Sequence, residues 1–155
     1  MADLSIIIVS YNTKKLLLGC IQSIEKHTQG VDYEVIVVDN ASTDGSADLV
    51  RRLSLKKSDV RVIENTINKG FAAANNQGIK IAKGKYILLL NSDTKILENT
   101  LLKMISWMDK NEKVGVSTCK LLNADRSIQA TGGYFPTLPR IFMWALFYLA
   151  STSKT

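Results

Sequence analysis

Five short apolar runs alternate with segments of helical periodicity, and this order limits the fold more than any other feature of the chain. The runs cover residues 4–9, 33–38, 60–63, 86–90 and 114–117. An uninterrupted short apolar run is typical of a strand covered on both faces in a parallel sheet. Between the runs, apolar residues recur at helical spacing at Leu17, Cys20, Ile21 and Ile24, and again at Leu97, Leu101, Met104, Ile105 and Met108. Strand–helix–strand repeats favour right-handed crossovers, so the sequence predicts an α/β fold with a mostly parallel sheet flanked by helices.

Length and composition favour a single domain. At 155 residues and 46% hydrophobic content, the chain can bury one substantial core. We expect the domain to span residues 1–155, with its core in 4–122 and a hairpin and an apolar tail in 123–155. Two more helices are expected, one after the capping residues 42–46 and one from near Gly70 to before Gly84.

Charge and cysteine content exclude some functions. The net charge of +6 comes from scattered Lys and Arg residues, which is typical of a solvated surface. The aromatic residues are not interleaved with basic ones, so nucleic acid is not an expected partner. Cys20 and Cys119 belong to no metal-binding or disulfide pattern, and this fits a reducing compartment. No apolar run reaches the roughly 18 residues that span a bilayer. We therefore predict a cytoplasmic protein.

The apolar tail, residues 138–150, needs a partner surface because it is apolar on all sides. The candidate surfaces are the chain's own sheet, a second copy of the chain and the inner face of a membrane. Self-association is favoured, since the tail lacks the Lys- and Arg-rich polar face of an interfacial helix.

Polar residues follow the first four runs directly or closely. These are Ser10–Asn12, Asp39–Asn40, Asn65 with 68–70, and Asn91–Asp93. Each group alone is typical of turns and helix caps, but parallel strands bring their carboxyl ends to one edge, where α/β sheets bind ligands. The sequence holds neither a G-x-G-x-x-G turn after its first strand nor a G-x-x-x-x-G-K-[ST] loop, which argues against a dinucleotide dehydrogenase and a P-loop phosphotransferase.

Several of these residues suggest chemistry. Asp93 either holds a hard divalent cation shared with substrate phosphates or caps the turn before Thr94. Asp39 either accepts hydrogen bonds from a base or ribose or serves as a turn carboxylate. Tyr11 either stacks on a base or packs beneath the second loop. Asn75, on the apolar face of its helix, either serves the site or pins the helix to a loop.

Four ordered motifs resemble those of the family-2 glycosyltransferases, which have the nucleotide-sugar-binding GT-A fold. They are "SIIIVSYN", "YEVIVVDNASTDGS", "NKGFAAANNQGI" and "GKYILLLNSDT", and the resemblance covers residues 4–122. The wording of "NNQGI" and "LLLNSDT" is most similar to the branch that includes bacterial rhamnosyltransferases.

The resemblance implies a role for each matching residue. Ser10, Tyr11 and Asp39 would surround the donor nucleoside, whereas Asn68, Lys69 and Gly70 would approach the ribose and diphosphate. The triplet 91–93 stands where the family has its D-x-D motif, with Asp93 binding Mg²⁺ or Mn²⁺. Asn91 replaces the first Asp, so an amide remains for donor contact while one negative charge is lost.

The family's general base is an acidic residue well downstream of the D-x-D position. Asp109, Glu112 and Asp125 are the acidic residues more than ten positions beyond Asp93, and none matches that motif. We therefore expect a truncated, donor-binding part of an inverting, metal-assisted glycosyltransferase. Its parent would transfer a sugar from a nucleotide-diphosphate sugar to a hydroxyl of a glycan or lipid-linked acceptor.

Two other functions remain open. One is a non-catalytic nucleotide-sugar-binding module of a larger assembly. The other is a sugar-nucleotide pyrophosphorylase, although the Gly-rich signature with a basic residue after the first strand is missing. An acidic motif further along a longer gene would favour the enzyme over the module.

Overall fold

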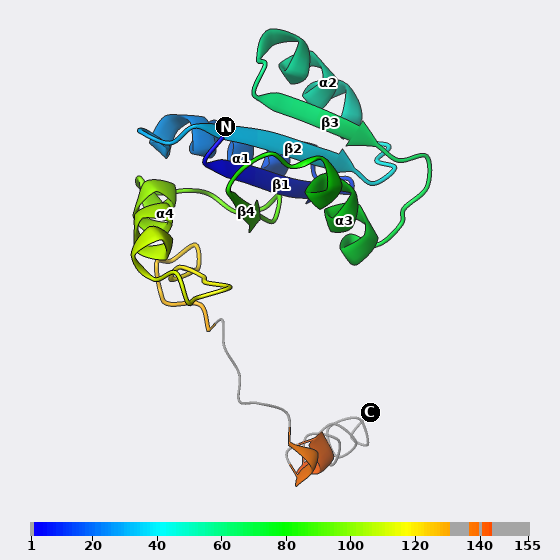
Figure 1. Cartoon of the computed structure of the whole chain (residues 1–155). Coiled ribbons are helices and arrows are strands. Elements are labelled where there is room, and N and C mark those ends of the chain that lie inside the picture. The colour runs from blue at the N-terminus through cyan, green and yellow to red at the C-terminus, as the bar shows by residue number, and fades with distance from the viewer. Residues whose placement is uncertain (1, 131–136, 140, 144–155) are drawn as a thin grey trace. The chain divides into compact units, whose positions relative to one another are not determined.

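The computed structural model describes residues 2–130, 137–139 and 141–143. The elements are β1 (Leu4–Ser10), α1 (Lys14–His27), β2 (Tyr33–Asp39), α2 (Ser46–Lys56), β3 (Val60–Glu64), α3 (Phe71–Ile81), β4 (Tyr86–Leu89) and α4 (Thr100–Lys110). The strands form one sheet in the order β3-β2-β1-β4 (Figure 1), and each neighbouring pair is parallel. The predicted α/β fold with a parallel sheet flanked by helices is therefore confirmed. The chain divides into two compact units, Met1–Ser117 and Thr118–Thr155.

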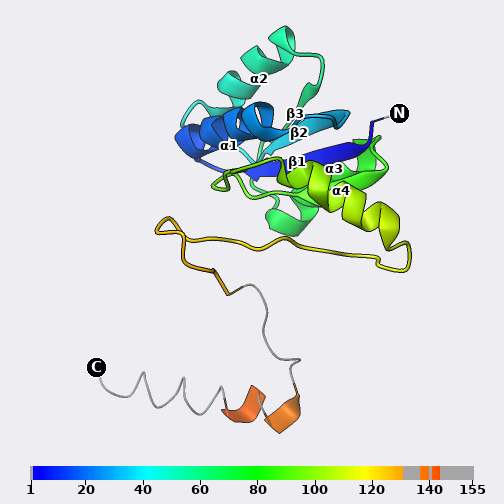
Figure 2. The ribbon, with the colours of Figure 1, turned by 90° about the vertical axis from the view of Figure 1, so that its left-hand side faces the viewer.

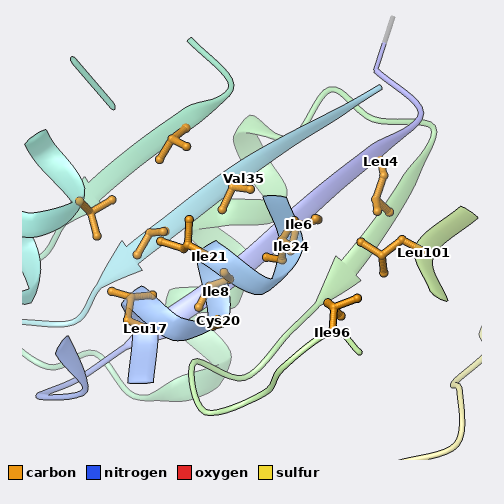
Figure 3. Packing of buried hydrophobic residues seen from close by; sticks show 13 residues of the cluster. Leu4, Ile6, Ile8, Leu17, Cys20, Ile21, Ile24, Val35, Ile96 and Leu101 are labelled. Atoms are coloured by element: carbon orange, nitrogen blue, oxygen red, sulfur yellow. The ribbon is translucent and has the colours of Figure 1, made fainter. Parts of the chain in front are cut away.

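The hydrophobic core lies between one face of the sheet and α1, α2 and α4. Alternate residues of the central strands, such as Ile6, Ile8 and Val35, meet the apolar stripe of α1 (Figure 3). The stripe is the predicted one, and its members Leu17, Cys20, Ile21 and Ile24 are all buried. Strand residues of opposite parity point to the other face, as the two-residue period requires.

Helix α3 covers that second face, opposite α1 (Figures 1 and 2). It packs on β1 and β2. The contact is close at Gly78, where an added Cβ would lie 2.6 Å from Cγ2 of Ile7. The helix begins after Gly70, as the sequence predicts, and thus starts beside the carboxyl ends of the central strands.

One carboxylate supports the beginnings of two helices. Asp44 accepts hydrogen bonds from the backbone N–H of Lys14 (2.8 Å) and that of Ser46 (3.0 Å). These are the first residues of α1 and α2. Because the first N–H groups of a helix lack partners inside the helix, Asp44 ties the loop before α2 to the start of α1.

Three local predictions are corrected by the structure. The run 86–90 is not covered on both faces among the described residues, because β4 is an edge strand and α3 packs on β1 and β2. Ile87 and Leu89 are consequently 46% and 49% exposed. The run 114–117 is not a strand. At its beginning, Val114 N–H donates to Asn111 O within a turn. Leu97 precedes α4 and is exposed.

The second unit contains the predicted hairpin. Leu122 and Ile128 form an antiparallel bridge around the turn. Most of the predicted tail, residues 140 and 144–150, lies outside the described residues, and the described parts of it, 138–139 and 141–143, are helical. Within the part of the chain that the structure describes, no helix has the length and apolar character to cross a membrane.

Candidate functional site

The carboxyl ends of the strands meet at one edge of the sheet, as predicted. Ser10, at the end of β1, is in register with Asp39, at the end of β2. On the other side of β1, the N–H of Leu90 donates to the carbonyl of Ile7 at 2.9 Å, so the turn 91–93 leaves β4 beside the end of β1. Asp39 is also in register with Glu64, the last residue of β3, and Asn65 N–H donates to the carbonyl of Asp39 at 2.9 Å. The parallel register therefore brings the beginnings of all four polar groups to this edge.

A chain of hydroxyl groups joins the ends of β1 and β4. Thr13 Oγ1 lies 3.0 Å from Ser10 Oγ and donates to Ser92 Oγ at 3.0 Å. Ser10 and Ser92 are both buried. The hydroxyl of Ser10 thus faces inward, and its predicted contact with a nucleoside would have to come from its backbone. Thr13 precedes α1 but makes no side-chain cap, because its hydroxyl bridges the two strand ends instead.

The loops after β1 and β2 are interlocked. Asn12 has a positive φ of 55°, an unusual conformation that local hydrogen bonds can maintain. Its N–H donates to Ser42 Oγ at 2.9 Å, and its Oδ1 accepts from the N–H of Thr43 at 2.8 Å. Tyr11 remains 50% exposed beside this junction. Half of its side chain is accordingly open to a ligand, as stacking on a base would require.

Asp39 is the most unusual polar residue of the edge. It is 2% exposed, and Oδ2 accepts from the N–H of Ser42 at 2.9 Å. Oδ1 is also buried but has no hydrogen-bond partner in the described part of the chain. A buried carboxylate oxygen without a donor is costly, so Oδ1 of Asp39 is a candidate acceptor for a hydrogen bond from a bound molecule.

A cavity at the opposite edge of the sheet provides a contrast. It measures about 790 Å³ and also contains a buried carboxylate, that of Glu34. Here every oxygen is satisfied, since Oε1 accepts from Ser5 Oγ and Lys83 N–H at 2.7 Å each and Oε2 faces Arg61 at 3.2 Å. Burial raises the pKa of Glu34, but these hydrogen bonds and the Arg61 charge bring the pKa below its ordinary value. We therefore interpret this group as structural.

The loop from β3 to α3 presents its three predicted site residues to solvent. Asn68, Lys69 and Gly70 are all exposed. Gly70 has a φ of 80°, a backbone conformation that glycine adopts without strain. The loop is attached to β2 because Lys69 N–H donates to the side chain of Asn40 at 3.0 Å.

Asp93 and Asn91 are exposed at the end of β4. The carboxylate of Asp93 has no hydrogen bond or ion pair with any described residue. It therefore does not cap the turn before Thr94, which is the alternative to binding a cation. Cys20 supports this turn from below by donating its thiol to the carbonyl of Asn91 at 3.7 Å. Burial and the negative charge of Asp93 raise the pKa of Cys20 to about 12. Cys20 is thus a neutral, unreactive thiol.

Asn75 is buried in α3, and its Nδ2 donates to the carbonyl of Phe71 at 3.0 Å. The amide therefore has a partner within its own helix. A role for Asn75 in binding substrate stays a prediction.

Asp109, the first of the downstream acidic residues, is not placed as a base at this edge. Asp109 accepts from Tyr86 Oη at 2.8 Å and pairs with Lys85. Tyr86 is the first residue of β4 and Lys85 precedes it, so both lie at the opposite end of the strand from Asp93. The bonds from Lys85 and Tyr86 hold the pKa of Asp109 below its usual range, so it stays ionised and engaged.

Sequence reasoning did not assign roles to Thr13, Asn40, Asn65 and Gln77. The side chains of Thr13 and Asn40 bond directly to predicted site residues, whereas Asn65 bonds to Asn40 and Gln77 bonds to Asn65. Their residue types are common in turns and on helix surfaces, so no sequence signal separates them from their neighbours.

The sequence is similar to a known protein family over most of its length. A family model described as glycosyl transferase family 2 matches residues 5–141. The poly(ribitol-phosphate) beta-glucosyltransferase of Bacillus spizizenii is 40% identical over 111 residues, covering 70% of this chain and 18% of that protein. The chain spans between 18% and 44% of the length of this and similar curated relatives.

Two solved structures are similar over 69% to 71% of this chain. S. aureus TarS in complex with UDP-GlcNAc has a TM-score of 0.64 and 28% identity, over 71% of this chain and 32% of that one. The mannosyltransferase PcManGT from Pyrobaculum calidifontis, in complex with GDP-Man and Mn²⁺, has a TM-score of 0.63 and 27% identity, over 69% of this chain and 32% of that one. These relatives give no specific support to the rhamnosyltransferase branch.

Proposed function

Because this chain belongs to glycosyl transferase family 2 and has its GT-A fold, we propose that it forms the donor-binding part of a glycosyltransferase. The reaction is transfer of a sugar from a nucleotide-diphosphate sugar to a hydroxyl group of an acceptor, with inversion at the sugar carbon. The observation that carries this proposal is the buried Oδ1 of Asp39, which lacks a donor. A nucleoside supplies such donors through base N–H and ribose O–H groups.

The donor lies across the edge formed by three strand ends. Asp39 accepts from the nucleoside, and the half-exposed ring of Tyr11 stacks against its base. Asn68, Lys69 and Gly70 approach the ribose and diphosphate from the exposed loop before α3. The lysine charge and the N–H groups at the beginning of α3 both favour an anion at this place.

Asp93 is the residue that would hold a divalent cation. The described residues contain no group of three or more His, Cys, Asp or Glu side chains that could hold a metal ion. A single free carboxylate fits Mg²⁺ or Mn²⁺ only when diphosphate oxygens and water complete the ligand set. We propose this shared arrangement, with Asn91 contacting the donor. When bound, the cation neutralises charge on the departing nucleoside diphosphate.

A general base must remove the proton of the acceptor hydroxyl. We propose that the base is supplied outside the described residues, because Asp109 is engaged at the other end of β4. This same observation favours a second candidate, a module that binds nucleotide sugars without catalysing transfer.

The proposed acceptor is a glycan or a lipid-linked glycan at the inner face of a membrane. The proposed location is the cytoplasm.

Calorimetric titration tests donor binding directly. UDP, GDP, ADP and CDP are titrated into the wild type with and without Mn²⁺, and we expect measurable affinity for at least one. Asp39→Asn should weaken it about 10- to 100-fold with or without metal, since a hydrogen bond to a buried charge is lost. Asp93→Ala should weaken it about tenfold in Mn²⁺ and little without the metal.

Asp59→Asn is the matched control, because Asp59 lines the cavity at the opposite edge and should leave affinity unchanged. If none of the four nucleotides bound to the wild type, the proposal would be refuted. Equal affinity of Asp93→Ala and wild type in Mn²⁺ would refute the metal assignment alone. Sugar transfer by the chain to an added acceptor would exclude the non-catalytic module.

A further inference from the structure

The loop from β3 to α3 is held by a network of side-chain amides that no step of the proposed reaction uses. We propose that Asn40, Asn65 and Gln77 are positioning residues, which keep residues 65–70 in the conformation that binds the donor. The inference rests on the proposed function, because it deepens the role of that loop. None of the three touches the donor itself.

Asn40 is the centre of the network. It follows β2 directly and is 2% exposed. Its Oδ1 accepts from Lys69 N–H at 3.0 Å and from Asn65 Nδ2 at 3.1 Å, while its Nδ2 donates to Asn68 Oδ1 at 2.7 Å. One amide thus binds the beginning, the middle and the end of the loop.

A reciprocal pair of amides ties the loop to α3. Asn65 Nδ2 donates to Gln77 Oε1 at 2.8 Å, and Gln77 Nε2 donates back to Asn65 Oδ1 at 2.9 Å. The backbone N–H of Asn65 also donates to Asp39 O at 2.9 Å. The loop therefore leaves β3 in a fixed direction relative to both β2 and the second turn of α3.

Two backbone N–H groups determine the orientation of every amide in the network. Lys69 N–H can only donate, so the atom of Asn40 that faces it is the oxygen. Gly70 N–H donates to Asn68 Oδ1 at 2.9 Å, which fixes that side chain as well. The orientations of Asn65 and Gln77 follow because each donor must face an acceptor.

The orientation of the Asn68 amide has a consequence for binding of the nucleotide sugar. Both contacts of Asn68 are made by Oδ1, so its Nδ2 group points away from the network, and no described residue accepts from it. Asn68 is exposed, and its amide N–H groups are available to oxygen atoms of a ribose or phosphate. The network thus presents a hydrogen-bond donor where the proposed donor substrate carries acceptors.

The network matters because the loop has little else to hold it. Residues 66–70 are all exposed, so apolar burial contributes little to their conformation. A loop that is ordered before binding loses less conformational entropy when a ligand arrives. We therefore expect loss of the network to weaken nucleotide binding more than it weakens the fold.

The test compares two substitutions on neighbouring residues of α3. Gln77→Met removes both bonds of the reciprocal pair at similar side-chain length. Asn76→Met introduces the same side chain at an exposed position outside the network. Affinity is titrated in Mn²⁺ with whichever of UDP and GDP binds the wild type more tightly, and exchange of the Lys69 and Gly70 amide protons is followed by NMR without ligand.

Gln77→Met should weaken binding about tenfold, the effect of losing one to two net hydrogen bonds. It should also speed exchange at Lys69 and Gly70 while the amides of β2 stay protected. Asn76→Met should change neither quantity. An affinity of Gln77→Met within twofold of wild type would overturn the inference, as would equal effects of both substitutions.

Asn40→Asp is a separate test of the assigned orientation of the Asn40 amide. It keeps the oxygen that accepts from Lys69, but places a second oxygen opposite Asn68 Oδ1, where Nδ2 now donates. Binding should again fall about tenfold or more, with the melting transition kept cooperative. Wild-type affinity in this variant would contradict the assigned orientation. If the wild type itself bound no nucleotide, the proposed function would fail, and the inference with it.

Discussion

The packing of α3 on the sheet leads to a prediction at Gly78. This glycine lies inside α3, where glycine costs about 0.8–1.0 kcal/mol relative to alanine. Replacement by alanine would therefore stabilise an isolated helix. In this protein the added Cβ would lie 2.6 Å from Cγ2 of Ile7 and 3.3 Å from its Cγ1. Ile7 is fully buried, and its β-branched side chain has little rotational freedom.

The expected magnitude follows from a matched pair of glycines. Gly19 lies inside α1, and its added Cβ would meet only Lys95 Cε at an ordinary 3.7 Å. Gly19→Ala should thus stabilise the protein by about 0.5–1 kcal/mol. Gly78→Ala has the same gain in helix propensity but an overpacking cost of about 1–3 kcal/mol. We expect Gly78→Ala to be about 1–3 kcal/mol less stable than Gly19→Ala.

Urea and thermal unfolding followed by circular dichroism measure this difference. For a chain of this length, it corresponds to a melting temperature about 2–12 °C lower for Gly78→Ala than for Gly19→Ala. Ile7→Ala/Gly78→Ala should be less destabilised than the sum of the single changes, because the new methyl group fills part of the space left by Ile7. If Gly78→Ala melted at or above Gly19→Ala, the close packing of α3 on β1 would be refuted.

Two further predictions concern the loop before α2 and the tail. Asp44→Ala should lower the free energy of unfolding by about 1–2 kcal/mol at pH 7, because one carboxylate accepts from the first N–H of both α1 and α2. The Ser46 hydroxyl and backbone N–H groups hold the pKa of Asp44 below its ordinary value. The stabilisation by Asp44 is therefore present above the unfolded pKa and is lost as the pH falls through the folded pKa. In urea unfolding, the difference in free energy of unfolding between Asp44→Ala and wild type should narrow below about pH 4. A difference that stays the same at lower pH would contradict this. Removal of residues 138–155 should yield a monomer that still binds nucleotide, and light scattering that finds the full chain already monomeric without detergent would exclude self-association through the tail.

The order of strands and helices could be predicted because it depends on local patterns. Uninterrupted apolar runs and 3.6-residue spacing reflect which faces are buried, whatever the partner is. The same logic located the strand ends, and with them Asp39 and Asp93. It failed at residues 114–117, since an apolar run becomes a strand only when another strand offers backbone partners.

Exposure of individual side chains could not be predicted in this way. The run 86–90 resembles a fully covered strand, yet Ile87 and Leu89 are half exposed because β4 lies at the edge of the described sheet. Whether a strand is central or at an edge depends on chain crossings between distant segments. A short window of sequence carries no information about them.

The amino-acid sequence by itself determined the class of fold, the family and the polar residues at the strand ends, because each follows from residue type and short-range spacing. Only the tertiary structure decided which polar atoms lack a partner and which residues support the others. Asp39 Oδ1 is unpaired because of where Ser42 and the neighbouring loops lie, and Asn40 meets Lys69 across a separation of 29 residues. Hydrogen bonds need partners within about 3 Å in a narrow range of directions, and the folded chain alone sets those distances.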